Sequence, residues 1–408
     1  MPILSRLQSA KMSLAMLVLP FALVGCGGGD TRVATSPATD VDSGLTVSGT
    51  TVVGDVSTVE ISGVILSSLP ETSLTSSVER VELGRLLFWD PILSGDRDVA
   101  CATCHLPEFG YTDGRDRSIG VGGVGSGPSR AVGHTGTVPR NAPSILNTVW
   151  NGIDEFGLFN PKQAPMFWDN RVQGLENQAL EPLRSEQEMR GNNFTVDELD
   201  VEIVNRLAAI PDYQTRFQSI YGAVAITQEL VGDALADYQR TLIANNSPFD
   251  RWVRGDSNAM SMAQIEGMSE FVQVGCASCH SGPMFSDFET HVLGVEEANG
   301  LQVPDSGDGS FAFRTPTLRQ LNFTSPYFHG GQSATLSEAI EFYDRPSRSQ
   351  NPNVSTNELD SEFLSTPSVN GERAIRIEQF LNALNDPNFD RTRPATVPSG
   401  LPVGGLIE

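Results

Sequence analysis

Two short stretches of the chain carry cysteine and histidine at a spacing that can hold a metal-containing cofactor. They read C-A-T-C-H at 101–105 and C-A-S-C-H at 276–280. In a C-x-x-C-H run the two thiols can bond one porphyrin, and the adjacent histidine supplies the proximal nitrogen to its iron. A zinc or redox C-x-x-C pair is the weaker alternative, because zinc needs four ligands in one place and the two runs are far apart. We therefore predict two covalently bound haem c groups, held by Cys101, Cys104, His105, Cys276, Cys279 and His280.

The remaining cysteine, Cys26, follows a short basic and then apolar stretch. Lys11 precedes an apolar run over 12–23, and L-V-G-C ends at Cys26. This order is typical of an export signal, and L-V-G-C resembles a lipobox, in which the cysteine is lipidated. The run is too short for a comfortable membrane span. We predict a lipoprotein signal peptide over 1–25, lipidation of Cys26, and a periplasmic protein anchored only by lipid, with the outer membrane as the expected site. A plain secretory signal cut elsewhere is the alternative.

The charge balance narrows the choice of partners. The 408 residues include 27 basic and 50 acidic side chains, for a formal net charge of −23. Such a surface repels phosphate backbones, so we expect no nucleic acid as a partner. The length suggests two or three domains with sizeable cores.

Helical signals dominate the segments that must position the two motifs. Capping boxes begin at Ser76, Thr195, Ser261 and Thr335, each followed by an apolar stripe at helical spacing. The predicted fold is mostly α, with two cytochrome-c-like haem domains, long loops and little sheet. We place a flexible tether at 26–75 with a short strand near 51–64, an N-terminal haem domain at 76–250, a C-terminal haem domain at 251–390, and a surface tail at 391–408.

A glycine-rich stretch, G-V-G-G-V-G at 120–125, follows the first motif. It formally matches the dinucleotide-binding pattern G-x-G-x-x-G. No strand is predicted before it and no helix after it, so a dinucleotide site is not expected. We interpret it as a mobile glycine loop.

Beyond the two motifs, the chain resembles the bacterial di-haem cytochrome c peroxidase family, which includes the MauG-type enzymes. The resemblance covers most of the chain, from about Val81 to Leu384. It is carried by L-G-R-L-L-F-W-D at 83–90, R-N-A-P-S at 140–144, F-W-D-N-R at 167–171, Q-A at 178–179, E-M at 188–189, R-T-P-T-L-R at 314–319 and P-Y-F-H-G-G at 326–331. It implies a peroxidatic haem at the first motif and an electron-transfer haem at the second.

The resemblance also implies catalytic residues at the first haem. Gln178 and Glu188 match the family's distal polar pair, and Trp168 matches the tryptophan between the haems. A carboxylate there can take a proton from one peroxide oxygen and return it to the leaving oxygen, while the amide hydrogen-bonds the bound oxygen. The alternatives are a surface carboxylate for Glu188 and a core residue for Trp168, and the second is compatible with the functional role.

Further metal ligands follow from the same resemblance. In the peroxidases a methionine ends a T-L-x-E-A-x-x-x-M run, and here Tyr343 stands at that position, as in MauG-type enzymes. A phenolate ligand lowers the reduction potential of its iron; the alternative is a core tyrosine. His134 matches a reversible distal ligand of the first haem, with a solvent-exposed loop histidine as the alternative. A calcium ion between the lobes would be held by Asn141, Thr324 and Pro326.

Three functions fit these residues. The first is a peroxidase that reduces hydrogen peroxide at the N-terminal haem, with electrons passed through the C-terminal haem from a small cytochrome c or cupredoxin. The second is a MauG-type oxidase that uses peroxide to modify a residue of a partner protein, and the third is a non-enzymatic two-haem electron carrier. Gln178 and Glu188 argue against the third, while Tyr343 favours the second. We predict the peroxidase, with a homodimer as one expected assembly because dimers are common in the resembled family.

Overall fold

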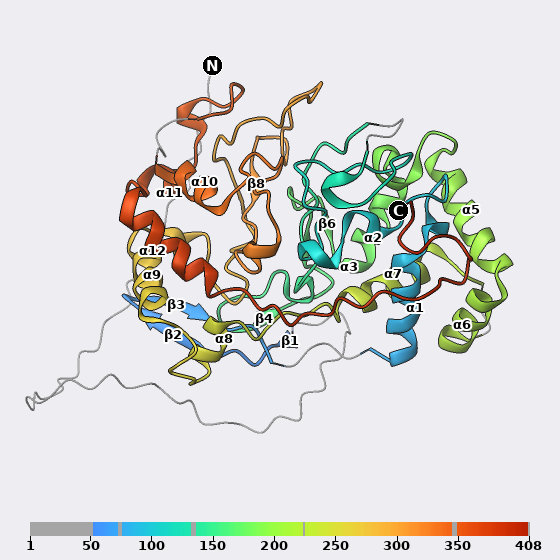
Figure 1. Cartoon of the computed structure of the whole chain (residues 1–408), viewed down its shortest axis with the longest axis horizontal. Helices are drawn as coiled ribbons and strands as arrows, with labels where there is room; N and C mark the ends of the chain where they lie inside the picture. The colour runs from blue at the N-terminus through green and yellow to red at the C-terminus, as the bar shows by residue number, and fades with distance from the viewer. Residues whose placement is uncertain (1–51, 72–75, 132–135, 223–224, 345–348, 407–408) are drawn as a thin grey trace, which may run out of the picture. The chain divides into compact units, whose positions relative to one another are not determined.

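The computed structural model describes residues 52–71, 76–131, 136–222, 225–344 and 349–406. Within these ranges the structure is mostly helical with long loops, which confirms the predicted fold class (Figure 1). The helices are α1 (Val78–Trp89), α2 (Cys101–Cys104), α3 (Leu175–Gln178), α4 (Glu181–Arg184), α5 (Val196–Ala209), α6 (Pro211–Tyr221), α7 (Gln228–Gln239), α8 (Pro248–Val253), α9 (Met262–Gln273), α10 (Leu336–Glu341), α11 (Ser361–Ser365) and α12 (Gly371–Asn382).

The strands are short and form two-stranded antiparallel pairs. β1 pairs with β4, β2 with β3, β5 with β6, and β7 with β8. Their bounds are β1 (Val52–Val53), β2 (Thr58–Ile61), β3 (Val64–Ser67), β4 (Leu158–Phe159), β5 (Pro165–Met166), β6 (Val172–Gln173), β7 (Thr290–His291) and β8 (Phe313–Arg314).

The helix starts follow the capping signals closely. Thr195, Ser261 and Thr335 each accept a hydrogen bond from the backbone N–H three residues later, at the starts of α5, α9 and α10. The cap of α1 lies one residue later than predicted, at Ser77. Ser76 instead donates to a carboxylate oxygen of Asp237, 2.6 Å away.

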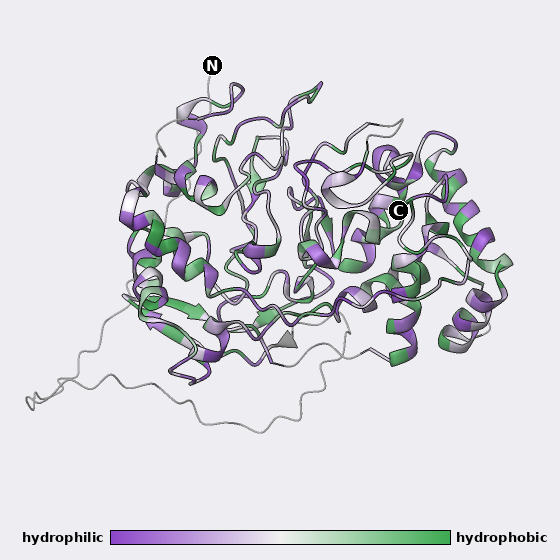
Figure 2. Cartoon of the chain, in the orientation of Figure 1, coloured by the Kyte–Doolittle hydropathy of each residue, from purple (hydrophilic) through white to green (hydrophobic). Residues whose placement is uncertain are grey.

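Two hydrophobic cores dominate the described residues. One gathers apolar side chains from α1, α5, α6 and α7. The other lies between α9 and α12, where Phe271 and Phe380 pack with ring centroids 5.2 Å apart. Figure 2 shows hydrophobic and hydrophilic stretches on these helices, as expected for elements with one buried face. Among the described helices none has both the length and the apolar character to span a bilayer.

Part of the predicted tether is folded. Leu66 and Leu69 are fully buried, and Leu66 belongs to the α9–α12 core. The Leu69 N–H donates to a carboxylate oxygen of Asp250, 2.9 Å away. The tether prediction is therefore wrong for residues 54–71, because contacts with residues far along the chain bury this segment.

The C-terminal tail returns to the first haem motif. Val397 is buried in the α1–α7 core, and the Thr103 hydroxyl donates to the Gly404 carbonyl oxygen, 2.7 Å away. Figure 1 shows this last segment running from α12 toward α1 and α2. The prediction of a surface tail is thus wrong for Val397, Gly404 and Gly405, which are buried, with Gly404 bonded to the motif at 101–105.

Candidate active site

Each C-x-x-C-H motif opens into its own cavity. The cavity at the first motif has a volume of about 1050 Å³ and is lined by Cys101, Cys104 and His105. The cavity at the second motif has a volume of about 260 Å³ and includes Cys276, Cys279 and His280 in its lining. The cavity at the first motif is therefore the larger of the two.

Both motif histidines are oriented for metal ligation. The Nδ1 atom of His105 lies 2.8 Å from the Tyr111 carbonyl oxygen, and that of His280 lies 2.9 Å from the Phe285 carbonyl oxygen. A carbonyl only accepts, so Nδ1 carries the proton in each ring and Nε2 is left for iron. Burial lowers the pKa of both imidazoles, which favours the neutral ligand form.

The motif cysteines suit two thioether bonds at each site. None of the four forms a disulfide. Helix α2 spans Cys101–Cys104, so its two thiols are separated by one turn and lie on the same face. A 3₁₀ turn over Cys276–Ser278 gives the second motif a similar bend. The donor set at each motif, two thiols and a neutral imidazole, therefore fits a c-type haem.

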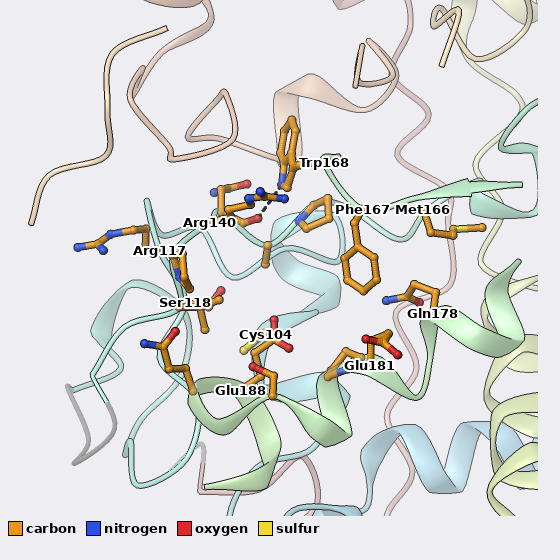
Figure 3. A pocket seen from close by; sticks show the side chains of 18 of the residues that line it. Cys104, Arg117, Ser118, Arg140, Met166, Phe167, Trp168, Gln178, Glu181 and Glu188 are labelled. Carbon is orange, nitrogen blue, oxygen red and sulfur yellow. Dashed lines mark hydrogen bonds between the residues drawn. The ribbon is translucent and has the colours of Figure 1, made fainter. Parts of the chain in front are cut away.

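The two distal residues predicted at the first haem line the first cavity. Gln178 ends α3, and Glu188 lies in a π-helical turn over Glu186–Arg190. Figure 3 shows Glu188 near Cys104 on one side of this cavity, and Gln178 near Phe167 and Glu181 on another side. Residues from separate short helices thus bring an amide and a carboxylate to the space next to the motif.

The environment of Glu188 raises the pKa of its carboxyl above the ordinary value. Burial is the largest influence and raises its pKa, while the Arg171 charge and a hydrogen bond with Ser185 oppose the rise. Part of the side chain still borders the cavity and is reached by solvent. A carboxyl that is largely desolvated but open to the cavity is suited to take up and return a proton.

Trp168 borders both cavities. Its indole N–H donates to the Asn141 carbonyl oxygen at 2.9 Å, and its own carbonyl accepts from the Arg314 N–H at 2.6 Å. Asn141 and Arg314 also line both cavities. The indole is therefore held by its polar neighbours in the wall between the two motif cavities.

Tyr343 lies in the second cavity with the motif at 276–280. It follows α10 and packs edge-on against Phe342 and Phe363, with ring centroids 5.3 and 5.9 Å away. Burial raises the pKa of its phenol, so the anionic form needs a positively charged partner such as a metal. Its place in the lining is compatible with iron ligation, which stays a prediction.

The predicted calcium ligands lie along the same cavity. Asn141, Thr324 and Pro326 all line it. The Asn141 amide nitrogen donates to the Arg115 carbonyl oxygen at 2.7 Å, which leaves the side-chain oxygen as the available metal ligand. Two other predicted residues, His134 and Cys26, lie outside the described residues.

Sequence reasoning missed a segment that lines the first cavity and carries one acidic residue, Asp305. Residues 300–307 line this cavity although they lie beyond the second motif in the chain. Arg140 joins them to the site through ion pairs with Asp305 and Asp169, each with a closest nitrogen–oxygen distance of 2.7 Å. Arg140 stood within a recognised run, but no local signal showed that Asp305 would be its partner.

Comparisons with known proteins agree with this geometry. Residues 78–258 match the family model for di-haem cytochrome c peroxidase. The methylamine utilization protein MauG of Methylorubrum extorquens is 35% identical over 272 residues, covering 65% of this chain and 68% of the relative. The cytochrome c551 peroxidase of Nitrosomonas europaea is 30% identical over 331 residues, covering 79% and 85%.

The fold has solved counterparts as well. The crystal structure of a MauG-like protein associated with microbial copper homeostasis aligns with a TM-score of 0.62 and 26% identity, covering 76% of this chain and 91% of that chain. The likeness to the diheme peroxidase BthA from Burkholderia thailandensis, with a TM-score of 0.62, 20% identity and coverage of 85% and 96%, concerns the fold alone. The motifs, the paired cavities and these relatives together show that the chain belongs to the di-haem cytochrome c peroxidase family, with two c-type haems and peroxidase activity.

Proposed function

We propose that the chain reduces hydrogen peroxide in the first cavity, with Glu188 and Gln178 as the groups that handle it. The observation that carries this proposal is the presence of both side chains in the cavity of the first motif, which is the larger of the two. Bound there, haem would supply the redox-active iron. The overall change converts peroxide, two electrons and two protons into two waters.

The protein's own contribution is proton transfer and orientation. The Glu188 carboxylate accepts the proton from one peroxide oxygen and returns it to the other as the O–O bond breaks. Burial raises the pKa of this carboxyl and so makes it a stronger base than a solvated glutamate. The Gln178 amide donates a hydrogen bond to the oxygen atom that bears the developing charge.

The route of the electrons passes the second motif. We propose that a small electron-donor protein delivers them at the second haem, and that Trp168 lies on the path because it borders both cavities. The same proposal includes export with lipidation at Cys26, and a calcium ion held by Asn141, Thr324 and Pro326. It also includes iron ligation by His134 and assembly as a homodimer.

A second function, oxidation of a residue on a partner protein, is favoured by Tyr343. A phenolate ligand at the second haem would lower its reduction potential and make it a poor electron acceptor. Peroxide added to the purified diferric protein separates the two. Fast turnover with a reduced cytochrome supports the peroxidase, and a long-lived near-infrared charge-resonance band with slow turnover supports the oxidase.

The role of Glu188 is tested by Glu188→Gln, with Glu186→Gln as the matched control. Glu186 lies in the same π-helical turn, but its side chain is 58% exposed and pairs with Arg190. Because general acid–base catalysis contributes about 10²–10⁴-fold, Glu188→Gln should slow the stopped-flow reaction with peroxide by that factor. The control should react at the wild-type rate. A near-normal rate for Glu188→Gln would remove this carboxylate from the mechanism.

A further inference from the structure

The glycine-rich stretch at 120–125 has no role in the function described so far, yet it touches the turn that carries Glu188. The Val121 N–H donates to the Glu188 carbonyl oxygen at 3.1 Å. Ile119 and Val121 are fully buried, so the start of the stretch packs inside the protein and is not a free surface loop.

Gly120 allows the two backbones to approach this closely. A Cβ atom at Gly120 would lie 2.1 Å from the Gln187 carbonyl oxygen and 2.2 Å from the Glu188 carbonyl oxygen. Gly120 does not have a positive φ, so crowding alone excludes a side chain there. Any larger residue would have to push the π-helical turn away.

Gly95 makes a similar contact at the end of the same turn. Its N–H donates to the Met189 carbonyl oxygen at 2.8 Å, and a Cβ atom there would lie 1.9 Å from the Arg190 carbonyl oxygen. Backbone segments at Gly95 and Gly120 thus both hold the carbonyls of the turn. The position of the Glu188 backbone depends on both contacts.

The Arg130 side chain holds the backbone of the glycine-rich stretch in place. The residue is 3% exposed, and its side chain donates four hydrogen bonds to backbone carbonyl oxygens. The acceptors are Ile119 at 2.7 Å, Gly120 at 2.9 Å, Gly125 at 2.9 Å and Leu406 at 3.0 Å. A guanidinium has its donors in a fixed planar fork, so this set of acceptors defines the shape of the loop.

We propose that Arg130 and Gly120 are positioning residues for the peroxide-handling carboxylate of Glu188. Arg130 shapes the glycine-rich stretch, and Gly120 lets that stretch hold the peptide of Glu188 so that the side chain stays over the cavity. This inference rests on the proposed role of Glu188. It gives the glycine-rich stretch a catalytic support function that its resemblance to a dinucleotide motif would not suggest.

The test is a double-mutant cycle on the haem-loaded protein. Gly120→Ala and Arg130→Lys are each combined with Glu188→Gln, and the rate constant for the reaction with peroxide is measured by stopped flow. A displacement of about 1 Å can cost about 10²-fold, so each single variant should lose about 10–100-fold. In the Glu188→Gln background the same changes should alter the rate constant less than twofold, because no carboxylate remains to be positioned. Lysine keeps the charge of Arg130 but cannot reach four carbonyls at once.

Gly267→Ala is the matched control. A Cβ atom at Gly267 would lie 2.0 Å from the Arg376 carbonyl oxygen, a similar crowding within the α9–α12 core. This variant should lower the unfolding midpoint but leave the peroxide rate within twofold. A loss of rate as large as that of Gly120→Ala would mean that general destabilisation explains both, and would overturn the proposal.

Hydrogen–deuterium exchange gives a readout that does not depend on activity. In Gly120→Ala and Arg130→Lys, exchange should accelerate in peptides covering 119–123 and 186–191, and remain unchanged around α12. Unchanged exchange at 186–191, or equal rate losses with and without the Glu188 carboxylate, would refute the positioning role. If Glu188→Gln alone has no effect on rate, the proposed function fails instead, and the exchange data still decide whether the contact holds the turn.

Discussion

Replacing Asp250 by asparagine should strongly destabilise the α9–α12 core. The Asp250 and Arg319 side chains are 0% and 1% exposed and form two hydrogen bonds of 2.9 and 3.0 Å. Asp250 also accepts from the Leu69 N–H at 2.9 Å and from the Ser247 hydroxyl at 2.5 Å. The carboxylate therefore joins α8, the segment at 54–71 and the loop around Arg319.

The magnitude follows from the loss of one partner in a buried ion pair. Asparagine keeps the shape but removes the charge, so the Arg319 guanidinium remains buried without its counter-ion. Such losses cost about 3–5 kcal/mol, a large part of the stability of a domain. Glu270→Gln is the control, since Glu270 pairs with Arg373 at 2.7 Å in the same core but the Arg373 side chain is 41% exposed. Breaking that pair should cost at most about 1 kcal/mol.

Urea unfolding of the haem-loaded protein, followed by far-ultraviolet circular dichroism, measures both losses. Asp250→Asn should lower the midpoint well below that of Glu270→Gln. If the two variants unfold at the same urea concentration, the buried pair is not the junction inferred here.

Three further predictions concern the second motif and the path between the cavities. Tyr343→Phe should abolish the low-spin electron paramagnetic resonance signal of one haem, because the phenyl ring offers no ligand. Trp168→Phe should slow electron transfer between the haems, measured by stopped flow, without changing the reaction of peroxide. Hydrogen bonding to Asp287 is the largest influence that raises the pKa of His291, and hydrogen bonds with Cys279 and Asp360 add to it; haem attachment at Cys279 leaves the two carboxylates to keep this pKa raised. The charged His291 side chain contributes its full stabilisation below the unfolded pKa of about 6.5, and this stabilisation is lost as pH rises toward the folded pKa. In urea titrations, His291→Asn should therefore lower the free energy of unfolding more at pH 6 than at pH 9.5.

Each of these predictions has a result that would count against it. Tyr327→Phe is the control for Tyr343, since Tyr327 lines the same cavity but donates to the Leu321 carbonyl oxygen at 2.8 Å; an unchanged spectrum for Tyr343→Phe would refute ligation. Equal electron-transfer rates in Trp168→Phe and wild type would exclude the indole from the path. A destabilisation by His291→Asn that is independent of pH would show that packing, and not charge, accounts for its contribution.

The parts of the site that could be predicted from the sequence are those that lie within short sequence motifs. The haem motifs, Gln178, Glu188 and Trp168 each stand in a local pattern, and in the structure they line the two cavities, while their roles stay predictions. The helix caps at Thr195 and Ser261 are equally local, because the cap and its partner are three residues apart.

Contacts between distant segments could not be predicted in the same way. Leu69 meets a partner 181 residues away, and composition alone made its segment look like a flexible tether. The glycine-rich stretch looked mobile because its sequence does not show that Arg130 and Leu406 surround it. Such pairings depend on how distant segments pack together in the cores, and residue spacing along the chain does not indicate them.

The bond between Thr103 and Gly404 has a consequence for how the protein is made. It connects the first haem motif to residues 301 positions later in the chain. Because synthesis proceeds from the N-terminus, the Gly404 partner of Thr103 is added to the chain only after the second motif at 276–280 has been made. The packing behind the first motif is thus completed only once residues near Gly404 are available, although this motif is the first of the two to be translated.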